Sequence, residues 1–305
     1  MNACAESLFK TMNIKGQLLK NAPLAKYTSW RVGGPAEQLF LPEDKQDIQL
    51  FLSSLPASTP VFWMGLGSNL LIRDGGIPGV VVNTRGRLKQ MYRTEDSTIY
   101  VEAGVPCAHV ARFCGEQGLT GAEFLAGIPG TLGGALKMNA GAFGGETWDI
   151  VSNVEMISSE GSITERTADD FDIQYRSVIG HSNEWFIAAK LQLKSGDTCA
   201  SQEKIKVLLA KRNQSQPTNQ PSCGSVFKNP DYDYAARLIE ACDLKGHSIG
   251  GAQVSKKHAN FIINTGSAKA SDIEALIHYV QSEVKQQQGV FLQTEVCIVG
   301  QGSSQ

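Results

Sequence analysis

Residues 127–146 read GIPGTLGGALKMNAGAFGGE and contain seven glycines in twenty positions. A glycine inside a helix or strand costs roughly 0.5–1 kcal/mol relative to alanine, so an ordinary core element does not tolerate this density. We expect the backbone here to be left bare so that a large flat group, such as the ring system of a flavin, can lie against it. The alternative is a glycine-rich loop that packs against neighbouring strands of the protein itself.

A second glycine-rich stretch, GLGSNLLIRDGG, begins at Gly65, directly after a predicted strand at residues 61–64. Gly65 and Gly67 can adopt positive φ and aim consecutive backbone N–H groups at an anion such as a pyrophosphate. A Rossmann fingerprint would need a third glycine where Leu70 stands, and a P-loop would need Gly-Lys-Ser/Thr, which is absent. The alternative is an ordinary turn between two strands.

Composition narrows the function classes. The chain has 305 residues, 42% of them hydrophobic and 19% charged, which is typical of a folded globular protein. Lys and Arg number 28 against 30 Asp and Glu, and no basic run is present, so we expect no nucleic-acid partner. Seven cysteines without a CxxC pair favour reduced thiols and predict no metal site. Because no long apolar stretch or signal peptide is found, we expect a cytoplasmic protein without membrane contact.

Four segments are expected along the chain. They are a helical lead-in at residues 1–26, a small α+β region at 27–85, a second α+β region at 86–198 and a C-terminal domain at 199–305.

Local patterns predict several elements within these segments. Residues 44–55 carry apolar side chains at helical spacing, and Ser271 with Glu274 forms a capping box that opens a helix ended by Gly289. Residues 290–299 alternate as a strand, and residues 213–222 are typical of a long exposed loop.

The two glycine clusters are followed by YRS at residues 175–177, CGSVFKNP at 223–230 and QTEV at 293–296. These motifs, in this order, resemble the UDP-N-acetylenolpyruvoylglucosamine reductase family from about residue 27 to residue 300. The resemblance implies an α+β protein with a two-part FAD-binding fold of the vanillyl-alcohol-oxidase (PCMH) type and a C-terminal substrate domain. It also implies reduction of the enolpyruvyl ether of a UDP-sugar by NADPH, giving UDP-N-acetylmuramate for peptidoglycan.

The resemblance assigns catalysis to Arg176, Ser225 as proton donor and Glu295. An arginine can grip a carboxylate that gains negative charge during reduction, and a positioned hydroxyl can supply a proton to carbon. An ionised Glu295 would repel such charge, so we expect it to be protonated or linked through water. From composition alone, a surface ion pair, a turn residue and a solvated strand position would be the favoured explanations of these three residues, and the joint match of the motifs reverses that preference.

The expected ligands are non-covalent FAD, NADPH and the UDP-sugar, and no histidine lies in either glycine cluster to attach a flavin covalently. The resemblance places FAD on residues of the two clusters: Gly65, Gly67, Ser68, Asn69, Leu70, Gly127, Pro129, Gly130, Thr131, Gly133, Gly134, Asn139 and Gly141. The expected substrate contacts are Lys228, Asn229, Lys257 and His258. We expect a monomer.

The short spacings between Arg176, Ser225 and Glu295 resemble the compact subtype of the family, which lacks a tyrosine-bearing loop over the UDP-sugar. Ser177 and Val178 depart from the more frequent Tyr-Arg-Asp-Ser pattern, which leaves the local hydrogen bonding around the arginine open. Two other interpretations remain: a sugar or alcohol oxidase of the same fold, and a nucleotide-binding module without catalysis.

Overall fold

The computed structural model describes residues 13–94, 96–180 and 182–303. The chain forms two compact units. Unit 1 comprises the described residues up to Lys20 together with Gln38–Leu66 and Gly79–Ala210, and unit 2 comprises Asn21–Glu37, Gly67–Pro78 and the described residues from Lys211 onward. The four-part division expected from the sequence stays a prediction.

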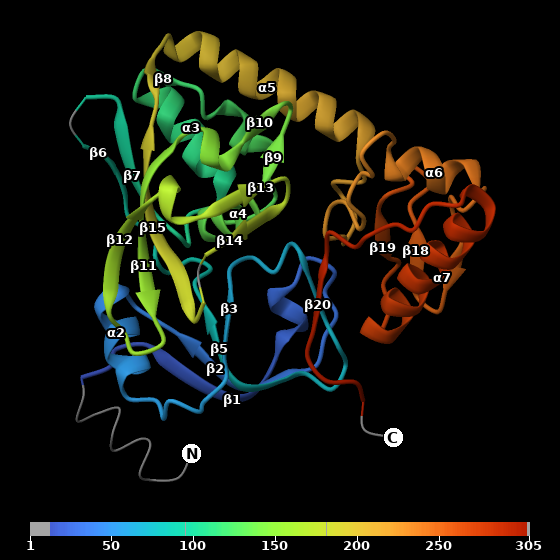
Figure 1. The fold of residues 1–305 in the computed structure, drawn as a ribbon, viewed down its shortest axis with the longest axis horizontal. Coiled ribbons are helices and arrows are strands. Elements are labelled where there is room, and N and C mark those ends of the chain that lie inside the picture. The colour runs from blue at the N-terminus through green and yellow to red at the C-terminus, as the bar shows by residue number, and fades with distance from the viewer. Residues whose placement is uncertain (1–12, 95, 181, 304–305) are drawn as a thin grey trace. The chain divides into compact units, whose positions relative to one another are not determined.

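The largest sheet of unit 1 has five antiparallel strands in the order β12-β11-β15-β7-β6 (Figure 1). Their bounds are β6 (Met91–Arg93), β7 (Thr98–Glu102), β11 (Val151–Ser158), β12 (Ile163–Thr167) and β15 (Glu184–Gln192). Helices α3 (Cys107–Glu116) and α4 (Leu132–Met138) share one hydrophobic core with this sheet, in which Ile99, Val110 and Leu136 are fully buried. Burial of this apolar area stabilises the unit by roughly 25 cal/mol per Å².

A four-stranded sheet has the order β1-β2-β5-β3. Its strands are β1 (Gln17–Pro23), β2 (Pro35–Leu41), β3 (Val61–Met64) and β5 (Ile77–Asn83), with β3 parallel to β5. The prediction of a helical lead-in is wrong for residues 17–23, because pairing with β2 overrides the local helical preference. Residues 1–12 lie outside the described residues.

Helix α2 (Lys45–Ser53) confirms the helix predicted at residues 44–55. Its apolar face, including Phe51, packs into a core with residues of β5. Asp44 caps the helix by accepting a hydrogen bond from the Asp47 N–H at 2.8 Å.

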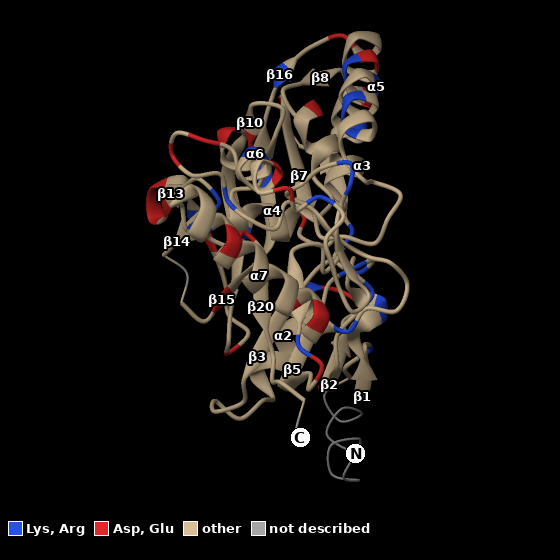
Figure 2. Cartoon of the chain, turned by 90° about the vertical axis from the view of Figure 1, so that its right-hand side faces the viewer, with Lys and Arg blue, Asp and Glu red and all other residues tan. Residues whose placement is uncertain are grey.

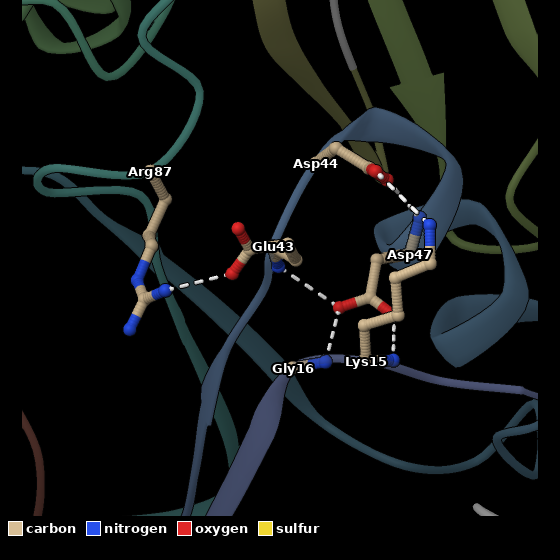
Figure 3. A network of polar contacts seen from close by, with 6 residues as sticks. All are labelled: Lys15, Gly16, Glu43, Asp44, Asp47 and Arg87. Atoms are coloured by element: carbon tan, nitrogen blue, oxygen red, sulfur yellow. Dashed lines mark hydrogen bonds and ion pairs between the residues drawn. The ribbon is translucent and has the colours of Figure 1, made fainter.

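The buried carboxylate of Asp47 holds the start of the described chain in unit 1 (Figure 3). It accepts hydrogen bonds from the N–H groups of Lys15 and Gly16, each at 2.7 Å, and from that of Glu43 at 2.9 Å. Three donors offset the cost of burying this group. The Glu43 side chain is itself paired with Arg87 at 3.1 Å.

The remaining elements of unit 1 are short and connect the larger ones. They are β8 (Leu119–Thr120) paired with β16 (Lys194–Ser195), β9 (Gly141–Ala142) paired with β10 (Gly145–Glu146), β13 (Asp172–Gln174) paired with β14 (Ser177–Ile179), and the 3₁₀ turns η2 (Glu123–Gly127), η3 (Thr147–Asp149) and η4 (Ala168–Asp170). Helix α5 (Thr198–Ser215) follows them.

Unit 2 builds its own core around helix α7 (Ala270–Gln288), whose predicted apolar face is buried and whose end at Gly289 is confirmed by a left-handed cap. Its other elements are η1 (Leu24–Tyr27), β4 (Leu70–Ile72) parallel to β20 (Cys297–Val299), helix α6 (Ala235–Ala241), and the antiparallel sheet β17 (Ser248–Ile249), β18 (Ala252–Val254) and β19 (Ile262–Asn264). The buried Trp30 donates from Nε1 to the Ile262 carbonyl at 2.7 Å.

The start of α7 differs from the prediction. The helix begins one residue before Ser271, and Asp74 accepts hydrogen bonds from the Ala270 and Ser271 N–H groups at 3.0 Å each. Glu274 pairs instead with Arg73 at 2.8 Å. The helix start is therefore capped by Asp74, which is distant in sequence, and by the local Asp272, which accepts a hydrogen bond from the Lys269 N–H at 3.0 Å, instead of by Ser271 and Glu274.

Two further boundaries differ. Within residues 290–299 only Cys297–Val299 form a strand, and Thr294 makes an isolated antiparallel bridge with Phe227. The expected loop at 213–222 begins later, because α5 continues to Ser215. No helix in the described part of the chain is long and apolar enough to span a membrane.

Candidate active site

The glycine-rich segment 127–146 in unit 1 packs largely against the protein itself. A Cβ atom at Gly127 would lie 2.5 Å from the Phe143 ring, and one at Gly145 would lie 2.8 Å from the Phe124 ring. Contacts this short require glycine for the protein's own packing. The expectation of bare backbone throughout the segment is therefore wrong at these positions.

The two glycines inside α4 behave differently from each other. A Cβ at Gly133 would lie 2.9 Å from the Ala103 Cβ, whereas the nearest atom to a Cβ at Gly134 is the Thr131 Oγ1 at 3.9 Å. Gly134 thus has room for a Cβ at ordinary contact distance, while glycine is required at position 133 by the neighbouring Ala103. Of the two glycines in this helix, Gly134 is therefore the one whose backbone can face a ligand.

The first glycine loop is divided between the two units, and its unit 2 part carries backbone donors that suit an anion. In unit 1, a Cβ at Gly65 would lie 2.3 Å from Oγ1 of Thr131, a residue that is 2% exposed. In unit 2, Gly67 has φ +62°, and the N–H groups of Gly67 and Ser68 have no acceptor among the described residues. Unpaired donors of this kind are what a phosphate oxygen requires.

Asn139 is fully occupied with internal hydrogen bonds. Its amide nitrogen donates to Glu146 Oε2 at 2.8 Å and to the Gln174 carbonyl at 3.3 Å, and its oxygen accepts from the Trp148 N–H at 3.2 Å. The residue is 3% exposed and adopts a left-handed backbone with φ +41°. Asn139 therefore shapes the end of α4, and its contact with FAD stays a prediction.

Arg176 lies in a two-residue turn between β13 and β14 and has φ +55°, a left-handed conformation that is uncommon outside glycine. Its guanidinium donates to the carbonyls of Asn139 at 3.3 Å and Gly141 at 3.0 Å, and it lies 5.0 Å from the Tyr175 ring centroid. The strained turn and the two carbonyls position the cation at the end of the glycine-rich segment.

Ser225 lies in unit 2, in a segment held by the buried Asn260. The Val226 N–H donates to the Asn260 carbonyl at 2.9 Å, and the Asn260 side chain forms two bonds with the Phe227 backbone at 3.0 Å and 2.8 Å. Ser225 is half-buried, and its hydroxyl makes no hydrogen bond to another residue of the described chain. The sequence analysis did not single out Asn260; the available signal was an asparagine set among the apolar residues that follow His258.

Glu295 lies on the segment that runs antiparallel to that of Ser225. The Glu295 N–H donates to the Val226 carbonyl at 2.8 Å, and the Lys228 N–H donates to the Gln293 carbonyl at 2.9 Å. The structure thus brings Ser225 and Glu295, which belong to two separate sequence motifs, onto neighbouring segments of unit 2.

The segment that carries Glu295 is tied to the first glycine loop. The Asn69 side chain donates to the Glu295 carbonyl at 3.1 Å, and the Cys297 N–H donates to the Asn69 carbonyl at 3.0 Å. Burial and the nearby Glu295 carboxylate raise the pKa of the Cys223 thiol well above its ordinary value. Cys223 is therefore an unreactive neighbour at neutral pH.

The other predicted substrate residues also lie in unit 2. Asn229 Oδ1 accepts from the Ala235 N–H at 3.1 Å, where α6 begins. Lys257 Nζ donates to the Asn213 carbonyl at 2.5 Å. Burial, together with the charge of Lys245, lowers the pKa of His258, so this imidazole is neutral at pH 7.

Comparison with known proteins decides the family. Residues 216–299 match the C-terminal domain of UDP-N-acetylenolpyruvoylglucosamine reductase, and residues 36–167 match an FAD binding domain. The reductase of that name from Methylococcus capsulatus is 57% identical over 290 residues, which cover 95% of both chains. The chain belongs to the UDP-N-acetylenolpyruvoylglucosamine reductase family.

Other members of this reductase family support the assignment and the fold. The Alkalilimnicola ehrlichii protein is 55% identical over 289 residues, covering 95% of this chain and 97% of its own. The crystal structure of the Thermus caldophilus reductase (MurB) superposes with a TM-score of 0.79 at 30% identity, covering 93% of this chain and 98% of the other. The predicted resemblance and the α+β fold with an FAD-binding part are confirmed.

Proposed function

We propose that this chain uses bound FAD and NADPH to reduce the enolpyruvyl ether of UDP-N-acetylglucosamine enolpyruvate to UDP-N-acetylmuramate, a step in making peptidoglycan precursors. The observation that carries the proposal is the identity of 57% over 95% of the chain to a reductase of this name. The FAD binding domain match spans both glycine clusters. Gly65, Thr131 and Gly134 in unit 1, and Gly67 and Ser68 in unit 2, are the residues we assign to FAD.

FAD, when bound, supplies the hydride that it has taken from NADPH. Hydride addition to the enolpyruvyl group leaves negative charge that is delocalised into the substrate carboxylate. We assign stabilisation of this charge to Arg176, whose guanidinium forms paired hydrogen bonds with carboxylates. The Asn139 and Gly141 carbonyls hold the cation in place before the reaction, so little reorganisation is needed during it.

We assign the proton that completes the reduction to the Ser225 hydroxyl. A hydroxyl that has no partner among the described residues can donate to substrate without first breaking an internal bond. Asn260 and the bridge to Thr294 fix the backbone that carries it. We assign Glu295, on the neighbouring segment, to the return of a proton to the serine, in a protonated or water-linked form.

Lys228, Asn229, Lys257 and His258 remain our proposed contacts to the UDP-sugar. We further propose that the enzyme acts as a cytoplasmic monomer on its two small-molecule partners, NADPH and the UDP-sugar. No membrane or nucleic-acid partner is part of this proposal.

An absorbance titration of the holoenzyme tests the proposed function. NADPH added without oxygen is expected to bleach the flavin band, and the UDP-enolpyruvyl sugar is then expected to restore it with one equivalent of UDP-N-acetylmuramate formed. An oxidase of the same fold would recover its colour with oxygen but not with the enolpyruvyl sugar. A chain that binds no FAD after reconstitution would contradict the proposal altogether.

A further inference from the structure

Arg212, in the last turn of α5, is a half-buried cation with little compensation. Its Nε donates to the Gln216 side-chain oxygen at 3.1 Å, and no carboxylate among the described residues forms an ion pair with it. The other half-buried arginines of the described chain each have a carboxylate or two backbone carbonyls as partners: Arg73, Arg87, Arg166 and Arg176.

This arrangement carries an electrostatic penalty that an anion would relieve. Burial lowers the pKa of the Arg212 guanidinium, and no neighbouring charge offsets the effect. The two terminal nitrogens of the guanidinium make no hydrogen bond to another described residue. They present a planar fork whose geometry matches two oxygens of a carboxylate or phosphate.

A second cation is attached to the residue next to Arg212. The Lys257 ammonium donates to the Asn213 carbonyl at 2.5 Å, and Thr218 Oγ1 fixes the Asn213 side chain at 2.8 Å. All of these residues belong to unit 2, which also carries Ser225 and Glu295. Lysine and arginine residues recur along α5 up to this turn (Figure 2).

We propose that Arg212, with Lys257 beside it, binds a phosphate ester of one of the reaction's two nucleotide ligands. A phosphate is favoured over a carboxylate because two cations, Arg212 itself and the Lys257 ammonium bonded to the backbone of the next residue, suit a group that carries more than one negative charge. The source is either the diphosphate of the UDP-sugar or the 2′-phosphate that distinguishes NADPH from NADH. This inference rests on the proposed function.

The test compares Arg212→Gln with Lys211→Gln in the FAD-loaded enzyme. Lys211 is an exposed neighbour on the same helix, so its replacement removes the same charge from almost the same place. Calorimetry measures the binding of UDP, and steady-state kinetics measures KM for the UDP-sugar and the preference for NADPH over NADH. Loss of hydrogen bonds to a charged ligand is expected to weaken binding by about 10- to 100-fold in Arg212→Gln, against less than about 2-fold in Lys211→Gln.

The measured quantity that changes identifies the ligand. Weaker UDP binding with an unchanged preference for NADPH assigns Arg212 to the substrate diphosphate, and a lost preference with unchanged UDP binding assigns it to the 2′-phosphate. Equal behaviour of the two variants in both measurements overturns the inference, while continued turnover shows that the proposed function stands without it. If Arg212→Gln does not fold, protection of Arg212 in the wild-type holoenzyme from phenylglyoxal by UDP or by NADPH gives the same decision, and absence of protection by either contradicts it.

Discussion

The segment 127–146 with Arg176, and the segment 223–230 with Ser225, both hold one polar side chain by means of backbone groups, but they do so differently. The first uses closely packed glycines and a left-handed arginine whose guanidinium bonds two carbonyls. The second uses a single buried asparagine, Asn260, and an antiparallel bridge. The comparison shows that glycine density reports close packing first, and that a ligand surface has to be argued position by position.

The largest expected effect concerns the second segment. Ser225→Ala removes the proposed proton donor, so reoxidation of the reduced flavin by the enolpyruvyl sugar is expected to slow by about 10²–10⁴-fold. Bleaching by NADPH is expected to proceed at the wild-type rate, because that step does not involve the serine. Stopped-flow absorbance separates the two steps.

Ser222→Ala, three residues upstream, serves as the control for Ser225→Ala and should leave both rates unchanged. Unaltered reoxidation in Ser225→Ala would remove Ser225 from its role and leave the second segment with a purely structural purpose.

The corresponding change in the first segment is Arg176→Lys. Lysine keeps the charge but loses the planar fork and its two carbonyl partners, so kcat is expected to fall by about 10²–10³-fold. A fall in kcat larger than the rise in KM would show that the arginine acts mainly as charge develops. Arg112→Lys, at an exposed position of α3, is the control. Equal kinetics for the two variants would contradict the proposed role.

A pH experiment tests how much the carboxylate of Glu123, at the start of the turn η2 that leads into the segment 127–146, contributes to stability. Burial opposes ionisation of Glu123, but hydrogen bonds from Thr120, Gly121 and Lys204 outweigh it and lower the pKa from 4.5 to about 2. Because the pKa is lower in the folded state, this stabilisation is complete above pH 4.5 and is lost as the pH falls toward 2.

Glu123→Gln is therefore expected to lower the free energy of unfolding at pH 7 by at most about 3 kcal/mol, and to flatten the loss of stability between pH 4.5 and 3. Urea unfolding at several pH values measures both quantities. Glu165→Gln, at an exposed ion pair with Lys190, is the control and should cost less than about 1 kcal/mol. The same slope with pH in wild type and Glu123→Gln would show that Glu123 is not the titrating group.

The smallest effects separate packing glycines from ligand-facing ones. Gly133→Ala forces a Cβ against Ala103, so it is expected to lower the free energy of unfolding by about 1–3 kcal/mol. Gly134→Ala has room and is expected to raise stability by up to about 1 kcal/mol, because alanine favours a helix. Chemical denaturation of the apoprotein measures both changes.

FAD affinity is then compared in the same pair. Gly134→Ala is expected to weaken FAD binding although it does not destabilise the apoprotein. Gly133→Ala is expected to lower the stability of the apoprotein more than it lowers the affinity for FAD. The reverse pattern would show that Gly134 does not face the cofactor.

Local patterns predicted the elements whose apolar faces repeat at helical spacing. Helix α2 and the buried face of α7 were found where the sequence placed them, because repeated apolar side chains must be buried. The start of α7 was not fully predictable, since part of its cap comes from Asp74, far away in the chain. Gln17–Pro23 were assigned to a helix because their strand partner, β2, is not visible in local sequence.

The sequence by itself determined the family, the cofactor class and the identity of the polar residues, because those depend on motif order and side-chain chemistry. Only the tertiary structure decided that Gly127 and Gly133 serve internal packing, that Arg176 bonds the carbonyls of Asn139 and Gly141, and that Ser225 and Glu295 lie on neighbouring segments. The physical reason is that contact distance is set by how remote segments pack, and no local pattern encodes which atoms will lie opposite a given residue.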